Sequence, residues 1–212
     1  MNIKKTAGLL TNFAIKRLAE ILGITVFIAG ILLLLALTSY SPDDPNFIFP
    51  EGTEIKNLLG FNGSFISDLF FQSIGLIAYL LSFTFIITGF NIFKGKEFFL
   101  IIENTFFGIL YSVFGALFLT YFYSEDFTLY INGNGGFVGN YLDQTFLNSL
   151  IRINESISYY ILILLVLVLF LLSINFNLKN FYKNIKKIFN FFSNNKTKNY
   201  TNKSEIINEY IP

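Results

Sequence analysis

An uncharged apolar run of 18 residues, Ile21–Thr38, ends abruptly at the string Ser39-Tyr-Ser-Pro-Asp-Asp-Pro45. The run is close to the ~20 residues that an α-helix needs to cross a bilayer. Proline cannot continue a helix, and paired carboxylates cannot enter hydrocarbon without a large free-energy cost. The sequence therefore predicts a membrane helix that reaches the aqueous phase at this string.

The composition is that of an integral membrane protein. Of the 212 residues, 53% are hydrophobic and 14% are charged, whereas soluble domains carry about 25% charged residues. The chain contains neither Cys nor His. This excludes disulfides, thiolate nucleophiles and the Cys and His metal ligands, and it removes the commonest general base.

Further apolar runs predict an all-α membrane protein with four transmembrane helices. Ser67 or Asp68 is predicted to cap the second helix, because either side chain can accept a hydrogen bond from a free backbone N–H. Gln72 is expected to bond a helix that lies beside this one. The predicted spans are about 21–38, 69–90, 104–123 and 157–174.

The third span carries a stripe of small residues, Gly108, Ser112 and Ala116, spaced four apart. Such a stripe lets two helix backbones approach closely in a membrane. Packing inside one chain and a contact between subunits are the two interpretations.

Amphipathic segments flank the predicted spans. Residues 1–20 are a basic lead-in to the first span, with a secretory signal as the alternative. Residues 137–153 have the pattern of an amphipathic helix on the outer leaflet or over the bundle. Residues 178–192 interleave lysines with apolar side chains, which favours an interfacial helix held by anionic lipid over binding of nucleic acid. The predicted division is a cytoplasmic segment 1–20, a transmembrane domain 21–174 and a tail 175–212 that is disordered from residue 193.

Charge is distributed unequally between the two sides of the predicted membrane. Residues 1–20, 91–103 and 175–212 together hold 13 basic and 5 acidic residues. The segments on the other side hold 9 acidic residues and 2 basic ones, Lys56 and Arg152. Because Lys and Arg are retained in the cytoplasm, both termini are predicted to be cytoplasmic.

The spans lack the groups that carriers and membrane enzymes need. No Asp, Glu, Lys or Arg lies in the middle of a predicted span, although transport pathways normally contain ionisable groups. Asp43 and Asp44 could form a cation site or an acid–base pair, but a solvated helix stop is the expected role. The sequence predicts no catalytic residue, no metal site and no cofactor, with a small transporter or channel subunit as the alternative function.

Three strings resemble segments of one bacterial family. They are Ser39–Pro45, the segment from Gly60 to Leu80, and the glycine turn Gly135-Gly-Phe-Val-Gly139. Over about residues 20–175 the chain resembles the N-terminal four-helix membrane domain of the FtsK/SpoIIIE DNA translocases. The motif residues are Ser39, Tyr40, Pro42, Asp43, Asp44, Pro45, Gly60, Gly63, Asp68, Gly75, Ala78, Tyr79, Gly135, Gly136 and Gly139.

The resemblance implies an anchor for a hexameric, ATP-driven DNA pump at the division septum of the bacterial inner membrane. The implied partners are membrane lipids, other copies of the chain and other division proteins, with DNA reached only through a motor. The sequence contains no G-x-x-x-x-G-K-[S/T] phosphate loop, which such a motor requires. We therefore expect a non-enzymatic anchor that is encoded apart from its motor or results from a split gene. A chance resemblance of an unrelated structural protein is the remaining alternative.

Overall fold

The computed structural model describes residues 3–45, 54–95, 97–124 and 132–177, and six further positions between 179 and 190. Side chains are described from Thr11 onward. The chain divides into two compact units, Met1–Asn175 and Phe176–Pro212, and each is described by itself.

The first unit is built from helices, and the described part of the chain contains no β-strand. Four stretches are long and apolar enough to cross a membrane: Thr11–Thr38, Gly60–Phe93, Leu100–Phe122 and Glu155–Ser173. The predicted all-α architecture with four spans is confirmed. In chain order the helices are α1 (Ile3–Thr38), α2 (Gly60–Ile74), the 3-10 turn η1 (Gly75–Ile77), α3 (Ala78–Phe93), α4 (Leu100–Phe122), α5 (Gly136–Asp143), α6 (Phe146–Ile153) and α7 (Glu155–Ser173).

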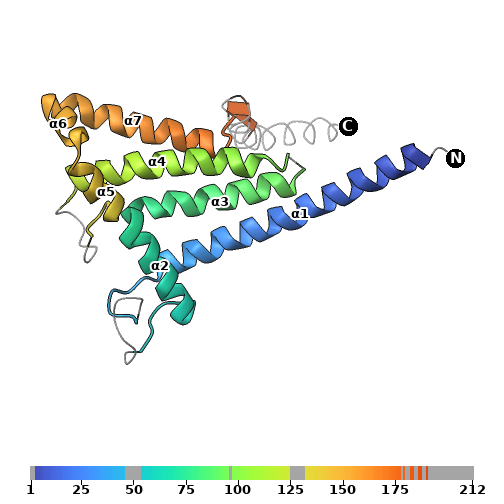
Figure 1. The fold of residues 1–212 in the computed structure, drawn as a ribbon, viewed down its shortest axis with the longest axis horizontal. Coiled ribbons are helices and arrows are strands. Elements are labelled where there is room, and N and C mark those ends of the chain that lie inside the picture. The colour runs from blue at the N-terminus through green and yellow to red at the C-terminus, as the bar shows by residue number, and fades with distance from the viewer. Residues whose placement is uncertain are drawn as a thin grey trace, which may run out of the picture. The chain divides into compact units, whose positions relative to one another are not determined.

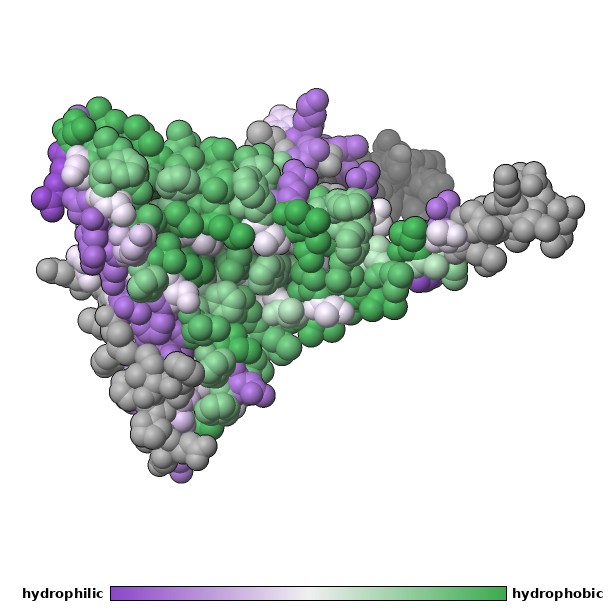
Figure 2. Space-filling model, in the orientation of Figure 1, coloured by the Kyte–Doolittle hydropathy of each residue, from purple (hydrophilic) through white to green (hydrophobic). Residues whose placement is uncertain are grey.

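The long helices pack in the order α1, α3, α4, α7 (Figure 1). The helices α1 and α3 are in close backbone contact. A Cβ atom added to Gly89 of α3 would lie only 2.3 Å from the backbone nitrogen of Phe27 in α1. Glycines at this crossing let the two backbones touch, which is how helices gain van der Waals contact in lipid. Figure 2 shows hydrophobic side chains over the flank of the bundle and hydrophilic ones along the end that carries α5 and α6.

The first helix is longer than one membrane crossing. α1 continues without a break from Ile3 to Thr38, so the basic lead-in and the first span form a single helix. At 1.5 Å per residue, 36 residues extend over about 54 Å, against a hydrocarbon thickness of ~30 Å. Arg17 and Glu20 form an ion pair with an N–O distance of 2.5 Å on its exposed N-terminal part.

The predicted start of the second helix is wrong. α2 begins at Gly60, and Ser67 and Asp68 lie buried in its middle instead of at an N-cap. Ser67 satisfies its hydroxyl within the helix, because its Oγ donates to the Gly63 carbonyl at 2.8 Å. The second span is also interrupted, since α2 ends at Ile74 and α3 begins at Ala78 at an angle to it (Figure 1).

The predicted amphipathic helix over 137–153 is two helices. α5 ends at Asp143, and Thr145 caps α6 by accepting a hydrogen bond from the backbone N–H of Leu147 at 3.3 Å. The apolar pattern continues across this break, so periodicity alone did not reveal it.

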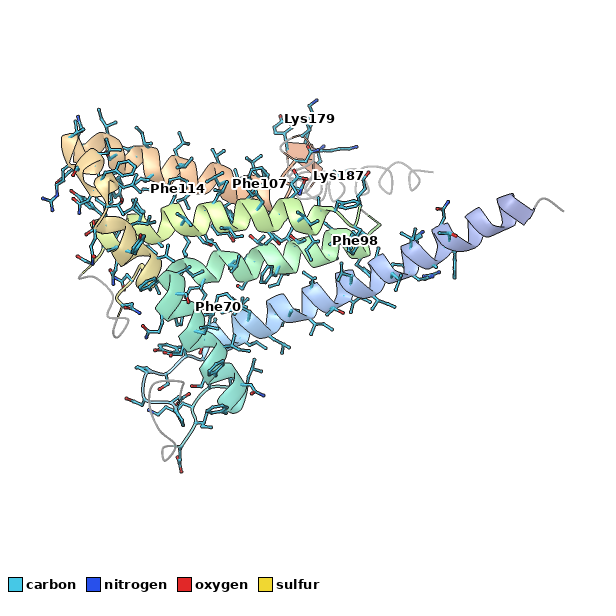
Figure 3. All side chains as sticks on the ribbon, viewed as in Figure 1. Phe70, Phe98, Phe107, Phe114, Lys179 and Lys187 are labelled. Carbon is cyan, nitrogen blue, oxygen red and sulfur yellow. The ribbon has the colours of Figure 1, made fainter. Side chains whose placement is uncertain are left out.

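Uncharged polar side chains bond the spans to one another inside the bundle. The hydroxyl of Thr84 in α3 lies 2.9 Å from that of Tyr111 in α4 and 3.0 Å from that of Ser173 in α7. Phe107 and Phe114 of α4 pack against the cluster that contains Tyr111 (Figure 3). Polar groups in hydrocarbon must find partners within the protein, and these contacts also fix the alignment of three helices.

The second unit is described at six positions of the predicted tail helix. Lys179, Lys183, Lys186 and Lys187 are exposed and helical (Lys179 and Lys187 are labelled in Figure 3). Their spacing of three and four places them on one helical face. Lipid binding by this face stays a prediction, and the predicted disordered segment 193–212 lies outside the described residues.

Candidate functional site

The three strings that carry the family resemblance lie at one end of the first unit. They belong to the segment after α1, to α2 with the break that follows it, and to the turn before α5. In Figure 1 these segments occupy the end of the bundle opposite the α3–α4 turn. We call residues 39–45, 54–79 and 132–139 the cap.

Asp44 is a structural residue of the cap. None of its surface is exposed, and its carboxylate accepts hydrogen bonds from the backbone N–H groups of Lys56 and Asn57, both at 2.8 Å. Asp43 points outward, where it pairs with Lys56 Nζ at 3.1 Å. The expected solvated pair is therefore wrong for Asp44, because the returning chain supplies donors that replace water. The two carboxylates do not converge on a common cation.

The beginning of the first string closes the end of α1. Ser39 Oγ donates to the Leu35 carbonyl at 2.7 Å and accepts from the backbone N–H of Leu58 at 3.1 Å. Pro42 lies in the turn that follows, which the backbone N–H of Asp44 closes by donating to the Ser41 carbonyl at 3.2 Å. The string thus ends one helix and holds the chain that starts the next.

Asn57 joins the first string to the helices on both sides of it. Its Nδ2 donates to the Ala36 carbonyl in α1 at 2.9 Å. Its Oδ1 occupies the space beside Gly63, where an added Cβ would lie 2.1 Å away. The next residue, Ser64, donates to the Pro45 carbonyl at 2.9 Å. A side chain at position 63 would separate these segments.

A chain of polar side chains connects all three parts of the cap. The Tyr40 hydroxyl donates to Asp68 Oδ1 at 3.2 Å, and Gln72 Nε2 donates to the same oxygen at 3.4 Å. Asn132 Nδ2 in turn donates to Gln72 Oε1 at 3.0 Å. Gln72 therefore bonds its own helix and a loop, where the sequence predicted a bond to another helix.

Aromatic packing lies beneath this polar chain. The ring of Phe71 lies between those of Tyr40 and Tyr79, with centroid distances of 4.9 Å and 5.6 Å. The Tyr79 hydroxyl donates to the Leu37 carbonyl near the end of α1 at 3.0 Å. Ala78, at the start of α3, is fully buried in the same cluster. The motif residues of α3 thus hold the end of α1.

Gly75 permits the break between α2 and α3. Its φ of +66° is strained for other residues, and an added Cβ would lie 1.8 Å from the Asn134 carbonyl oxygen. That oxygen accepts the backbone N–H of Leu76 at 2.9 Å. Gly136 contacts the same break, since a Cβ added to Gly136 would lie 2.7 Å from the Gly75 backbone nitrogen. The second and third strings are therefore in backbone contact.

Two further motif glycines, Gly135 and Gly139, contact α4, whereas a Cβ added to Gly60 would meet nothing within 4 Å. An added Cβ would lie 2.2 Å from the Ala116 carbonyl oxygen at Gly135 and 2.5 Å from it at Gly139. Both positions also meet the hydroxyl of Thr120. The glycine turn thus packs directly on α4 because it has no side chains on this face.

The small-residue stripe of α4 is buried within the chain. Ala116 lies under the glycine turn, and Ser112 is also buried. A Cβ added to Gly108 would be 3.4 Å from Leu81 of α3, and Gly108 lies outside the cap. The three residues face other helices of the same chain, and their importance for helix association stays a prediction.

Sequence reasoning missed the asparagines that hold the cap together. Asn57 and Asn134 are both buried, and the side chain of Asn134 donates to the Tyr123 carbonyl. The signal was available in Asn134-Gly135, since Asn-Gly pairs mark turns. Nothing local to Asn57 distinguishes it from a solvated loop residue.

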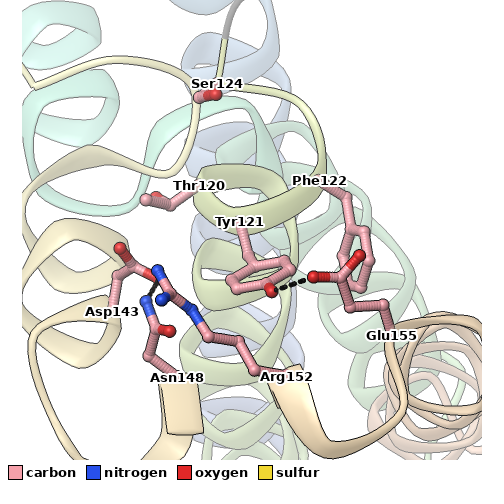
Figure 4. A pocket seen from close by; sticks show the side chains of 8 residues that line it. All are labelled: Thr120, Tyr121, Phe122, Ser124, Asp143, Asn148, Arg152 and Glu155. Carbon is pink, nitrogen blue, oxygen red and sulfur yellow. Dashed lines mark hydrogen bonds between the residues drawn. The ribbon is translucent and has the colours of Figure 1, made fainter.

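A polar groove lies beside the cap (Figure 4), with a volume of about 680 Å³. Its walls are the end of α4, the end of α5, the polar side of α6 and the start of α7. The Tyr121 hydroxyl donates a hydrogen bond to Glu155 Oε1 at 2.9 Å, and Asn148 Nδ2 donates one to Asp143 Oδ1 at 2.7 Å. Within the described ranges, no group of three or more His, Cys, Asp or Glu side chains could hold a metal ion. The groove offers separate positive and negative groups for binding.

Comparison with known proteins identifies one family. Residues 15–186 match the family described as the 4TM region of DNA translocase FtsK/SpoIIIE. Similar curated proteins are named DNA translocase FtsK. The one from Azospirillum brasilense is 30% identical over 112 residues, which cover 52% of this chain and 17% of the relative.

Two further relatives give the same result. The protein from Caulobacter vibrioides is 37% identical over 71 residues, or 34% of this chain and 9% of the relative. The protein from Shewanella oneidensis is 30% identical over 121 residues, or 54% and 13%. The chain thus matches less than a fifth of the length of each relative. No solved structure matches it.

Proposed function

Because the chain belongs to the family of FtsK/SpoIIIE four-helix transmembrane regions, we propose that it is the membrane-anchoring and septum-targeting domain of a DNA-translocase-like protein. That protein would serve bacterial cell division and chromosome segregation. We assign these 212 residues no catalytic role, and any movement of DNA would depend on a motor outside them.

The observation that carries this proposal is the interlocked cap. Its three strings join the ends of α1, α3 and α4 through buried hydrogen bonds and backbone contacts. An anchor under load needs spans that keep one arrangement, because helices in lipid have little hydrophobic force holding them together. The cap fixes that arrangement at one end of the bundle and presents a fixed surface to other division proteins and to further copies of the chain.

We propose that the cap faces away from the cytoplasm, in the inner membrane, with both termini cytoplasmic. The unequal distribution of Lys and Arg supports this orientation. The natural absence of Cys permits a direct test with Leu58→Cys in the cap and Lys94→Cys in the α3–α4 turn, which are both exposed. A membrane-impermeant maleimide should label only Leu58→Cys from outside the inner membrane, and the reverse pattern would overturn the orientation.

Septum targeting is tested by the distribution of a fluorescent fusion of this chain in dividing cells. The expected signal is concentrated at midcell and weakens when the cap is opened by Asp44→Ala. The exposed variant Asp43→Ala is the matched control, because it leaves the buried hydrogen bonds in place. An even distribution of the unaltered fusion around the membrane would contradict the proposal.

A further inference from the structure

The polar groove lies where two membrane spans end. Tyr121 and Phe122 are in the last turn of the span Leu100–Phe122, and Glu155 is the first residue of the span Glu155–Ser173. Aromatic side chains gather at the same level, where the hydroxyls of Tyr123 and Tyr159 lie 2.7 Å apart. Tyrosines with an apolar ring and a polar tip mark membrane–water interfaces. The groove is therefore at the level of lipid headgroups.

The groove presents one cation and two carboxylates to the same space. Figure 4 shows Arg152, Asp143 and Glu155 lining it together. The ion pairs found among the described residues do not include Arg152. Within the same part of the chain, Asp143 accepts one hydrogen bond from the neutral amide of Asn148, and Glu155 accepts one from the neutral hydroxyl of Tyr121. Each charged group therefore retains capacity for a ligand of opposite charge.

An apolar groove follows the polar one along α4, α6 and α7. Phe114 and Leu117 of α4 lie about two turns and one turn deeper than Tyr121, and Ile161 and Leu162 lie deeper than Glu155 along α7. α6 supplies Leu147, Leu150 and Ile151. This groove has a volume of about 170 Å³. Together the two grooves offer polar groups at the interface and apolar groups toward the membrane interior.

We propose that these grooves bind a zwitterionic phospholipid whose headgroup carries a primary ammonium, such as phosphatidylethanolamine. The Arg152 guanidinium binds the phosphate, for which its planar fork of donors is well suited. Asp143 and Glu155 accept N–H donors from the ammonium, and an acyl chain lies in the apolar groove. Two carboxylates beside one guanidinium disfavour an anionic lipid without an ammonium. The lipid thus joins α4, α6 and α7 beside the cap.

The test uses the full chain, purified and placed in lipid nanodiscs of equal amounts of phosphatidylethanolamine and phosphatidylglycerol. Extraction of the protein and native mass spectrometry then count the lipids that remain bound. We expect one phosphatidylethanolamine to be retained preferentially. Arg152→Gln should weaken its retention about tenfold, as for the loss of one charged hydrogen-bonding group. Lys56→Gln is the matched control, since Lys56 is an exposed cation of the outer loop.

A second arm tests the carboxylates separately. Replacing phosphatidylethanolamine by phosphatidylcholine removes the N–H donors but keeps the phosphate, and retention should decrease. The variant Glu155→Gln should reduce the preference for phosphatidylethanolamine over phosphatidylglycerol. Far-UV circular dichroism confirms that each variant is folded. Equal retention of all three lipids, or equal loss in Arg152→Gln and Lys56→Gln, would overturn the proposal.

Discussion

Replacing Asp44 by Ala should open the cap without disturbing the spans. The Asp44 carboxylate is completely buried and holds the N–H groups of Lys56 and Asn57 at 2.8 Å. Hydrogen bonds to a charged group contribute about 1.5–3 kcal/mol each, and a buried donor left without a partner costs about 1–3 kcal/mol. Because Lys56 is exposed and its N–H can be rehydrated, we discount its share and expect a loss of about 3 kcal/mol.

Asp43→Ala provides the matched control at the adjacent position. Its ion pair with Lys56 is exposed on both sides, with relative side-chain exposures of 73% for Asp43 and 63% for Lys56. Exposed pairs contribute little, so the expected loss is below about 0.5 kcal/mol. The two substitutions remove the same atoms and the same formal charge. Their difference therefore isolates burial and the two backbone hydrogen bonds.

The assay uses a single cysteine as a reporter of local opening. Ser64 is buried beneath the first string, with its hydroxyl on the Pro45 carbonyl, so Ser64→Cys should react slowly with a water-soluble maleimide. Where closing is faster than labelling, a loss of 3 kcal/mol raises the labelling rate about 150-fold. Far-UV circular dichroism should remain unchanged. The reasoning is refuted if Asp44→Ala labels no faster than Asp43→Ala in this background.

Three further substitutions, the first with a matched control, test other contacts. Gly75→Ala adds a Cβ 1.8 Å from the Asn134 carbonyl oxygen at positive φ, and it should lower the free energy of thermal unfolding by about 3–5 kcal/mol. Gly60→Ala is the control, since it is also at positive φ but its Cβ would have nothing within 4 Å. It should lower the free energy of unfolding by only about 1–2 kcal/mol. Gly89→Ala brings a Cβ to 2.3 Å from the α1 backbone and should lower the free energy of unfolding by about 2–3 kcal/mol. Chemical cross-linking between α1 and α3 should become weaker. Unchanged cross-linking would contradict the close crossing of the two helices. Tyr111→Phe keeps the buried ring but removes a hydroxyl that lies 2.9 Å from that of Thr84. The melting temperature should therefore fall by the equivalent of about 1 kcal/mol. A loss of stability above about 3 kcal/mol would mean that the polar cluster acts cooperatively.

The parts of the fold that depend on composition were accessible from the sequence. An uncharged apolar run avoids the unfavourable hydration of its apolar surface only by entering lipid or a core, so the four spans follow from length and hydropathy. The resemblance of the three strings also identified the family correctly. The start of α2 was not accessible, because Ser67 and Asp68 have the local pattern of an N-cap and are buried only through contacts with distant residues.

The candidate site shows the same division. The sequence identified Gly75, Gly136 and Gly139 as motif residues, but it did not reveal why glycine is needed at these positions. Glycine is needed because the backbone of another segment occupies the space of a side chain. A Cβ added at any of these positions would lie less than 3 Å from that backbone. Asn57 carried no sequence signal at all. Its role depends on the Ala36 carbonyl, 21 positions away.

The sequence by itself determined that this chain is a four-span membrane protein, and charge and motif patterns predicted its orientation and its family. These properties depend on the transfer of single segments between water and lipid, which each segment's own residues decide. Only the tertiary structure decided that Asp44 is buried, that three distant strings form one cap, and that Arg152 shares a groove with two carboxylates. Such properties depend on which backbone groups from other segments replace water around a side chain, and that is a consequence of packing.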